Sequence, residues 1–527
     1  MRLPVLILPL ALWACSVAPA PAQSPQEPAT SELRERAYGA ENRGDFAAAA
    51  DAFLELGKRQ PDDPEWVVSA GRCLGLSARY AAAIDLLDAA KDRFPGMLQV
   101  PAMLARTWLL KGERDEGAID PRGDIAEAAR IAEGVLAIDG DQEDSRLILA
   151  QARYLLGDWD EAVTQARQAV ERHPQRPGAH ILLGRIAMDR LQQLLQLHEQ
   201  GELSGQALAD LVGKIGEQRE LARREFARAA ALDDSRAHPH IMLARLALLD
   251  GDGEAARRHL LDALAIDPND GFVDHGRIAA GLDWQARAAA YAEVRARYEA
   301  RPGAVPAKAA TLRWYEAAAL YEGRQWQAAL DAFEAVLAAN PDATNSHYYA
   351  ALAAYELGDH DLATRHAAGY AAVSAPAFAD VVKRLGAEQR GQVAAILKFL
   401  ADRAYQRDAL AESRDLNHVI ALLYDTAEAW NNHAFLCRET GEFEAALTGY
   451  RRALEREPTS AQLHNDTAVV LHYHLPSEEH LAEARTLYAR AIELADKVLA
   501  DASANAEQKS AAMQARSDAQ QNLEAMH

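Results

Sequence analysis

Small and apolar residues fill the chain in short blocks, and Gly and Pro separate these blocks at a constant interval. Gly44 precedes Pro61 by 17 residues, and the interval returns at Gly157 and Pro174, at Gly251 and Pro268, and at Gly441 and Pro458. It also runs from Pro to the next Gly, at Pro95 and Gly112 and at Pro341 and Gly358. A glycine readily opens a left-handed turn, and a proline stops a helix. Each half-repeat therefore predicts one short helix and one turn.

Two half-repeats make a helix pair, and the resulting period of about 34 residues predicts an all-α chain without β-sheet. The composition agrees, because Ala is very abundant and β-branched residues are sparse. Each pair can bury its apolar face only against its neighbours, which leads us to expect stacking into an α-α superhelical solenoid. The pattern predicts about 10–12 pairs, in regular units at 30–63, 64–97, 98–142, 143–176, 177–235, 236–269, 310–343, 344–377, 427–460 and 461–497, and in less regular units at 271–302 and 393–426.

Three segments resemble tetratricopeptide repeats, namely GDFAAAADAF at 44–53, GDWDEAV at 157–163, and the stretch 427–458. The second half of the family's pattern is a small Ala, an aromatic residue, Ala-Leu and Pro. In the last segment these positions are Ala446, Tyr450, Ala453-Leu454 and Pro458. The resemblance covers almost everything after residue 30. It implies a solenoid that binds proteins or peptides through a concave face lined by the first helix of each unit, but it does not specify the ligand.

Departures from the regular period divide the expected fold. The unit with extra residues at 185–232 predicts two lengthened antiparallel helices, with Ser204 as a helix cap. The expected organisation is a signal peptide at 1–22, a tether at 23–30, a first repeat array at 30–269, a degenerate repeat or linker at 270–309, a second array at 310–497, and a C-terminal capping helix and tail at 498–527.

The N-terminus has the residue order of a targeting segment, because Arg2 precedes the apolar stretch 3–14. Two processing sites fit this segment. Ala20-Pro21-Ala22 has the small-x-small pattern of signal-peptidase cleavage, whereas Leu12-Trp13-Ala14-Cys15 resembles a bacterial lipobox in which Cys15 is lipidated. We therefore expect an exported protein, either a periplasmic or outer-membrane-associated lipoprotein or a secreted protein.

The formal net charge of −22 repels nucleic acid and anionic lipid, so both are excluded as general partners. Membrane contact is expected only through the N-terminal lipid anchor. Catalytic, phosphate-binding and zinc-protease motifs are missing from the sequence, so we expect no enzyme and no cofactor. No metal site is expected either, because the spacing fits no standard ligand set at the histidines His464, His472, His474 and His480. Cys73 and Cys437 are expected to be buried free thiols.

A recurrent arginine is the first candidate for ligand binding. On the first helix of several units it follows a small residue, as in Gly71-Arg72, Ala105-Arg106, Gly184-Arg185 and Ala244-Arg245. A guanidinium fork suits a carboxylate, so this row predicts binding of acidic or carboxylate-bearing peptide segments. The alternative is that each arginine pairs with Glu or Asp on a neighbouring helix and only holds the repeats together.

Aromatic residues form a second candidate row in the second array. Trp314 and Tyr348 are 34 residues apart, as are Tyr321 and Tyr355, and two asparagines continue the repeat at Asn431 and Asn465. Aromatic walls with amide groups suit an extended peptide or a glycan strand. The alternative is that these rings belong to the core between repeats.

These features favour an exported, non-catalytic scaffold that binds proteins or peptides through the concave face of the solenoid. Two other functions stay open, a polysaccharide-binding or export accessory protein and a subunit of an envelope enzyme complex. The oligomeric state is left open.

Overall fold

The computed structural model describes residues 30–526, so the expected signal segment and Cys15 lie outside the described residues. The described chain contains 25 α-helices, one short π-helical turn and no β-strand. This confirms the all-α prediction. The chain divides into two compact units, Met1–Asp233 and Asp234–His527, and each is described by itself.

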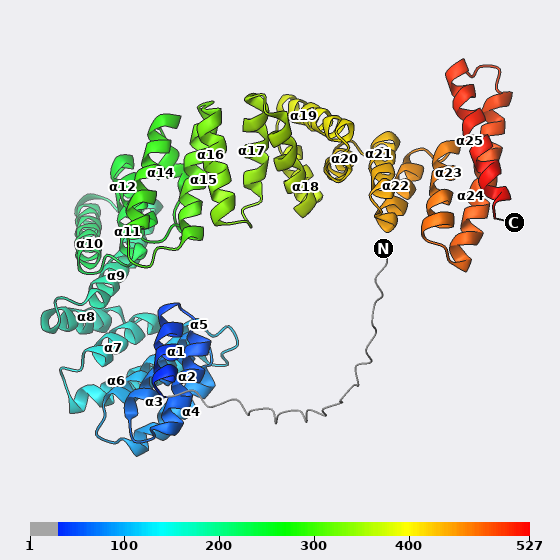
Figure 1. Ribbon diagram of the computed structural model, residues 1–527. Coiled ribbons are helices and arrows are strands. Elements are labelled where there is room, and N and C mark those ends of the chain that lie inside the picture. Colours follow the sequence, from blue (N-terminus) through cyan, green and yellow to red (C-terminus); the bar gives the residue numbers. More distant parts are fainter. Residues whose placement is uncertain (1–29, 527) are drawn as a thin grey trace, which may run out of the picture. The chain divides into compact units, whose positions relative to one another are not determined.

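Unit 1 consists of helix pairs in which each helix packs against the next along the chain (Figure 1). Its helices are α1 (Thr30–Asn42), α2 (Phe46–Arg59), α3 (Pro64–Leu76), α4 (Tyr80–Arg93), α5 (Gln99–Arg114), α6 (Pro121–Ile138), α7 (Glu143–Leu156), α8 (Trp159–Arg172), α9 (Pro177–Gln200) and α10 (Gly205–Leu232).

Unit 2 repeats the same arrangement and ends on an additional helix. Its elements are α11 (Ala237–Leu249), α12 (Gly253–Leu264), α13 (His275–Ala279), α14 (Trp284–Glu299), α15 (Pro306–Glu322), α16 (Trp326–Ala339), α17 (Asn345–Glu356), α18 (His360–Lys383), α19 (Ala387–Gln406), α20 (Leu410–Tyr424), α21 (Ala427–Glu439), α22 (Phe443–Arg456), α23 (Ala461–Val469), the π-helical turn η1 (Val470–His474), α24 (Glu478–Ala500) and α25 (Ala506–Glu524). Each unit is thus an α-solenoid, as the 34-residue period predicts.

The Gly and Pro spacing places the helix ends largely as expected. Gly44, Gly157, Gly251, Gly358 and Gly441 lie between the two helices of their pairs with positive φ angles. The aspartate that follows glycine often caps the second helix, because its carboxylate accepts a hydrogen bond from a backbone N–H of the first turn. Such caps are formed by Asp45, Asp252 and Asp359.

Gly112 is an exception to the turn prediction, because it lies inside α5 and opens no turn. A Cβ atom there would lie 2.6 Å from the Ile125 side chain and 2.7 Å from the Pro121 carbonyl oxygen. The glycine therefore permits the close approach of α6 to α5. Spacing alone could not distinguish this packing role from a turn.

The core of both units consists mostly of alanine, with one large aromatic ring on the second helix of many pairs. Tyr450 on α22 is 1% exposed, and Ala446 and Ala453 on the same helix are fully buried. Small residues let paired helices approach closely, and the ring fills the remaining space. The same role is taken by Phe53, Phe226, Phe333, Phe378 and Tyr488.

The extra residues of the fifth pair lengthen both of its helices, as predicted. Helices α9 and α10 pack along each other, and Leu191, Leu211 and Ile215 are buried in their seam. Ser204 occupies the cap position of α10, but its side chain makes no capping hydrogen bond. The predicted cap position is therefore confirmed, without the hydrogen bond that a capping hydroxyl usually accepts.

Residues 270–309, expected as a degenerate repeat or linker, contribute α13 and α14 to unit 2. One apolar cluster runs from Ala237 to Leu312 and includes Tyr291 and Tyr298 of α14. A second cluster runs from Ala317 to Ala519.

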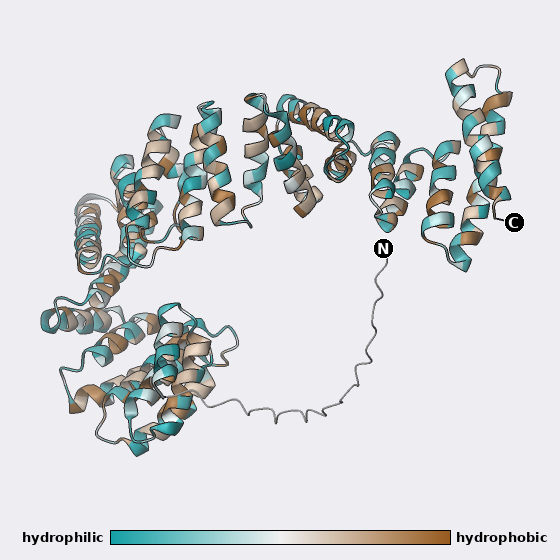
Figure 2. Cartoon of the chain, in the orientation of Figure 1, coloured by the Kyte–Doolittle hydropathy of each residue, from teal (hydrophilic) through white to brown (hydrophobic). Residues whose placement is uncertain are grey.

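The helices of both units carry hydrophobic and hydrophilic residues side by side (Figure 2). No described helix combines the length and apolarity that crossing a bilayer requires.

Candidate functional site

Two of the recurrent arginines are engaged inside unit 1. The Arg72 guanidinium lies 2.8 Å from the Glu41 carboxylate on α1, and Glu41 is only 15% exposed. Arg185 lies over the Tyr154 ring, with 5.2 Å between the guanidinium carbon and the ring centroid. The Arg72 contact matches the alternative, in which an arginine pairs with a carboxylate on a neighbouring helix. Arg185 also contacts a neighbouring repeat, but its partner is an aromatic ring.

The other two arginines are exposed. Arg106 on α5 and Arg245 on α11 make no hydrogen bond or ion pair with any described residue. They belong to different units, so the structure does not place them in one row. The preference for acidic ligands therefore stays a prediction, and Arg106 is its best-placed residue in unit 1.

The aromatic row lies in the core of unit 2 rather than along an open wall. Tyr348 is 6% exposed, and Trp314, Tyr321 and Tyr355 pack against the same cluster. The Tyr349 ring joins them, with centroids 5.8 Å from Trp314 and 5.4 Å from Tyr321. Burial raises the pKa of Tyr321 to about 12. The structure thus places these rings between repeats. The sequence could not show this, because a 34-residue spacing occurs at core positions and at surface positions alike.

The two asparagines are also turned inward. Asn465 on α23 is 4% exposed, and its carbonyl oxygen accepts a hydrogen bond of 3.3 Å from Asn522 on α25. The carbonyl oxygen of Asn431 on α21 is buried without a hydrogen-bond partner. Helix α25 covers the part of α23 that carries Asn465, so this amide is not available to a ligand in the described structure.

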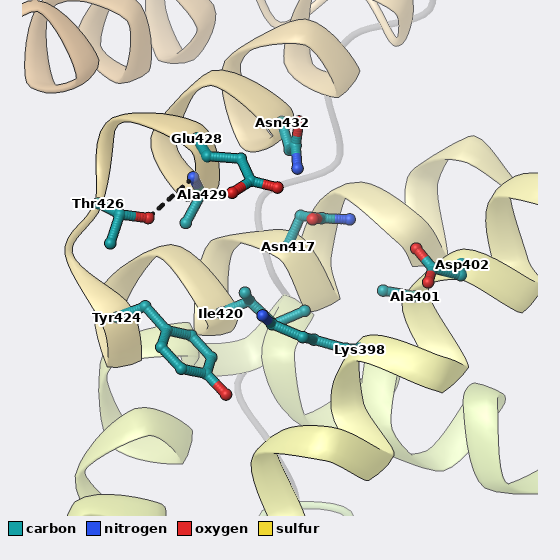
Figure 3. Close-up of a pocket in the computed structure, with 10 residues that line it drawn as sticks. All are labelled: Lys398, Ala401, Asp402, Asn417, Ile420, Tyr424, Thr426, Glu428, Ala429 and Asn432. Carbon is teal, nitrogen blue, oxygen red and sulfur yellow. Dashed lines mark hydrogen bonds between the residues drawn. The ribbon is translucent and has the colours of Figure 1, made fainter. Parts of the chain in front are cut away.

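A pocket of about 280 Å³ lies between α19, α20 and α21 (Figure 3). Lys398 and Asp402 line it from α19, and Glu428 and Asn432 line it from α21. The middle helix α20 supplies Asn417, Ile420 and Tyr424, and Ala401, Thr426 and Ala429 complete the lining. Figure 3 shows Glu428 and Asn432 on the opposite side of the pocket from Lys398.

The charged groups of this pocket have no ionic partner among the described residues. The Lys398 ammonium lies 4.3 Å from the centroid of the Tyr424 ring and forms no ion pair. Asp402 and Glu428 form none either. The Asn417 amide nitrogen donates a 2.9 Å hydrogen bond to the Ser413 carbonyl, which holds the side chain in place. One cation, two carboxylates and two amides therefore surround a space with apolar lining at Ile420 and Tyr424.

Sequence comparison identifies the repeats in both units. Residues 34–97 and 315–377 match one tetratricopeptide repeat family, and residues 122–186 match a second family of the same description. The chain is a tetratricopeptide-repeat protein. Repeat solenoids present extended faces to their partners, which makes this tetratricopeptide-repeat protein a protein-interaction scaffold. No curated protein matches the sequence.

Several solved structures are similar to parts of this tetratricopeptide-repeat protein. The solved chain of MamA from Desulfovibrio magneticus RS-1, residue 41 to its end, is 15% identical with a TM-score of 0.27, and the match covers 37% of this chain and 96% of that one. TTC0263 from Thermus thermophilus is 16% identical with a TM-score of 0.27, covering 48% and 98%. YrrB, described as having an unusual peptide-binding site, is 15% identical with a TM-score of 0.27, covering 44% and 100%. Identities and TM-scores this low do not indicate which ligand this chain binds.

The repeat register explains how the pocket was missed in the sequence. Lys398 and Asn432 are 34 residues apart, and each lies one position after the slot that contains Asn431 and Asn465. On a helix, one position is a rotation of about 100°, which is enough to turn a side chain from the core to the surface. The pocket residues therefore do repeat every 34 positions, but at the exposed position next to the slot of Asn431 and Asn465.

A cysteine–histidine contact in unit 2 lacks the properties of a nucleophilic pair. The Cys437 sulfur lies 3.5 Å from the His433 Nε2 atom, and both side chains are buried. Burial raises the pKa of Cys437 to about 11 and lowers the pKa of His433 to about 3. A neutral thiol and a neutral imidazole result, and neither is activated. Cys73 and Cys437 are buried free thiols, as predicted.

Proposed function

We propose that this protein is an exported, non-catalytic scaffold that binds a segment of another protein in the α19–α21 pocket. The observation that carries the proposal is the set of charged groups around this pocket that have no ionic partner among the described residues, Lys398 and Asp402 on α19 and Glu428 on α21. Surface charges without partners are ordinarily only solvated. Here they converge on one space with apolar lining, which is the usual composition of a recognition site.

The chemistry of the pocket favours an extended peptide with a basic side chain. The Asn432 amide can bond to both the N–H and C=O groups of a peptide backbone. The Asn417 amide nitrogen already donates to Ser413, which leaves its oxygen to accept from a peptide N–H. Asp402 and Glu428 together outweigh Lys398 in charge, so a Lys or Arg of the ligand gains attraction there. Arg106 in unit 1 is a separate contact for an acidic segment of a partner. Export, the lipid anchor at Cys15 and the envelope location belong to this proposal and rest on residues 1–22 alone.

The two alternative functions have less support. The polysaccharide hypothesis relied on an aromatic wall, and Tyr348 and its neighbours pack in the core. The hypothesis of a subunit of an envelope enzyme complex gains no support from the Cys437–His433 contact, because neither group is activated.

Site-specific photocrosslinking tests the proposal. A photoreactive phenylalanine analogue replaces Tyr424, which is 44% exposed at the pocket, and in a control it replaces Phe272, which is 73% exposed elsewhere in unit 2. The chain is expressed in its native host and the crosslinked products are identified by mass spectrometry. We expect a discrete protein product from position 424 and none from position 272. Equal products at both positions, or none at 424, would contradict binding in this pocket.

The location is tested in the same cells. The mature N-terminus is sequenced and its mass is measured for acyl chains. A chain that retains Met1 would contradict export, and an unmodified start at Gln23 would contradict lipidation of Cys15.

A further inference from the structure

Two histidines and an aspartate meet within one helix pair of unit 2, away from the α19–α21 pocket. His240 lies on α11, and His259 and Asp262 lie one turn apart on α12. One potential ligand atom from each side chain lies within 4.8 Å of the other two. The His240 Nδ1 atom is 3.8 Å from Asp262 Oδ2, and the two imidazole centroids are 6.0 Å apart.

One nitrogen of each imidazole in this cluster lacks a hydrogen-bond partner. The Nδ1 atoms of both His240 and His259 are buried and form no hydrogen bond. A buried polar atom without a partner is destabilising, so two neighbouring ones require an explanation. Elsewhere in unit 2, the paired histidines His347 and His366 place their Nδ1 atoms 3.0 Å apart and satisfy each other.

The protonation state of the cluster suits a cation. Burial lowers the pKa of both His240 and His259, which keeps the imidazoles neutral at physiological pH and leaves a lone pair on each ring. Arg297 on α14 donates a hydrogen bond of 2.8 Å to Asp262 Oδ1. This contact holds the carboxylate with its other oxygen, Oδ2, on the side of His240. Such an outer contact is typical of carboxylates that bind metals.

We propose that His240, His259 and Asp262 bind one divalent transition-metal ion, with Zn²⁺ as the best match. Two imidazoles and one carboxylate are a common ligand set for zinc, and water or a partner's side chain completes four-coordination. Zinc bonds of about 2.0–2.1 Å bring ligand atoms to roughly 3.4 Å from each other, so these side chains move inward by roughly 1–2 Å on binding. The ion links α11 to α12 and gives one nitrogen of each imidazole a partner.

Calorimetric titration with Zn²⁺ tests this site on the intact chain, purified without an affinity tag. We expect one ion bound per chain. The His259→Ala and Asp262→Asn variants should each weaken binding by at least ~100-fold, because loss of a ligand exceeds the effect of losing an outer contact. The His198→Ala variant removes an exposed histidine of α9 and should bind as the parent does. Mg²⁺ should not compete, because it prefers oxygen ligands.

A second readout keeps the test decisive if the His259→Ala variant fails to fold. Co²⁺ replaces Zn²⁺ in the parent chain, and its visible absorption reports four-coordination with nitrogen ligands. Asp262→Asn preserves side-chain shape, and circular dichroism checks its helix content. Absence of Zn²⁺ binding by the parent, or equal binding by the parent and Asp262→Asn, would overturn the proposal.

Discussion

Two neighbouring parts of unit 2 carry the same repeat position in opposite environments. Lys398 and Asn432 are exposed beside the α19–α21 pocket, whereas Asp466, a further 34 residues along, is mostly buried on α23. The difference comes from α25, which packs against α23 but reaches neither α19 nor α21. One repeat position therefore serves as a surface group in the middle of the array and as an interior group at its end.

The arginines of unit 1 extend this comparison. Arg72, Arg106 and Arg185 share one slot, yet Glu41 pairs with the first and the Tyr154 ring lies beneath the last. Only Arg106 of these three has its guanidinium free among the described residues. The recurrence of a residue type thus predicts where a side chain lies, but its neighbours decide whether a ligand can use it.

The largest expected effect is a loss of stability at the end of unit 2, where α25 covers α23, and not at the open α19–α21 pocket. Ala515→Asp places a charge in the buried face of α25 and should cost about 3 kcal/mol or more, because no partner is present for the carboxylate. Ala511→Asp, on the exposed face of the same helix, is the matched control and should change stability by less than about 0.5 kcal/mol. Denaturant unfolding measures both variants. Hydrogen exchange should rise in α23 for Ala515→Asp only, and an unchanged α23 would show that α25 does not cover it in solution.

Blocking the pocket should reduce partner binding without changing stability. Asn432→Trp fills the space between α19 and α21, and we expect a loss of about 2 kcal/mol in affinity, roughly 30-fold, as for a central contact. The readout is the crosslinking yield from position 424. Thr448→Trp on the second helix α22 is the control and should retain the yield, with both variants melting at the parent temperature. Full crosslinking by Asn432→Trp would place the partner elsewhere.

Asp466 on α23 should make the stability of unit 2 depend on pH. Burial raises the pKa of this carboxyl above its ordinary value of 3.8, so the folded chain holds the proton more tightly than the unfolded chain. Stability contributed by this group should therefore fall as pH rises from 3.8 through the folded pKa, and stay constant above it. Asp466→Asn removes this dependence. Unfolding free energies at a series of pH values test it, and an unchanged profile in the variant would contradict the assignment.

The smallest effects distinguish the engaged arginines from the free one. Arg72→Ala and Arg185→Ala should each lower stability by about 0.5–1 kcal/mol, through loss of the Glu41 pair and of the Tyr154 contact. Arg106→Ala should change it by less than about 0.5 kcal/mol. Thermal melting of the three variants measures the difference. If all three lower stability equally, Arg106 has an internal partner in solution and is not a ligand-binding residue.

The sequence predicted the fold closely and the site poorly. The 17-residue interval located the helix pairs, and the departure from it at 185–232 located the lengthened hairpin α9–α10. The resemblance to tetratricopeptide repeats singled out the aromatic position of Tyr450, which is buried. It failed at Gly112, where close packing and a turn require the same residue. The aromatic row failed for a similar reason, because a 34-residue spacing applies equally to core and surface positions.

Helix formation, helix length and repeat period were determined by the sequence itself, because Ala content, Gly turns and Pro stops act over a few residues. Tertiary structure alone decided which side chains remain available. A rotation of one residue separates exposed Asn432 from inward-facing Asn431, and α25 closes over Asn465. The His240–His259–Asp262 cluster also needed the tertiary structure, since its residues come from two helices and form no motif in sequence. Exposure and mutual distance depend on how helices pack, and that information is distributed over the whole unit.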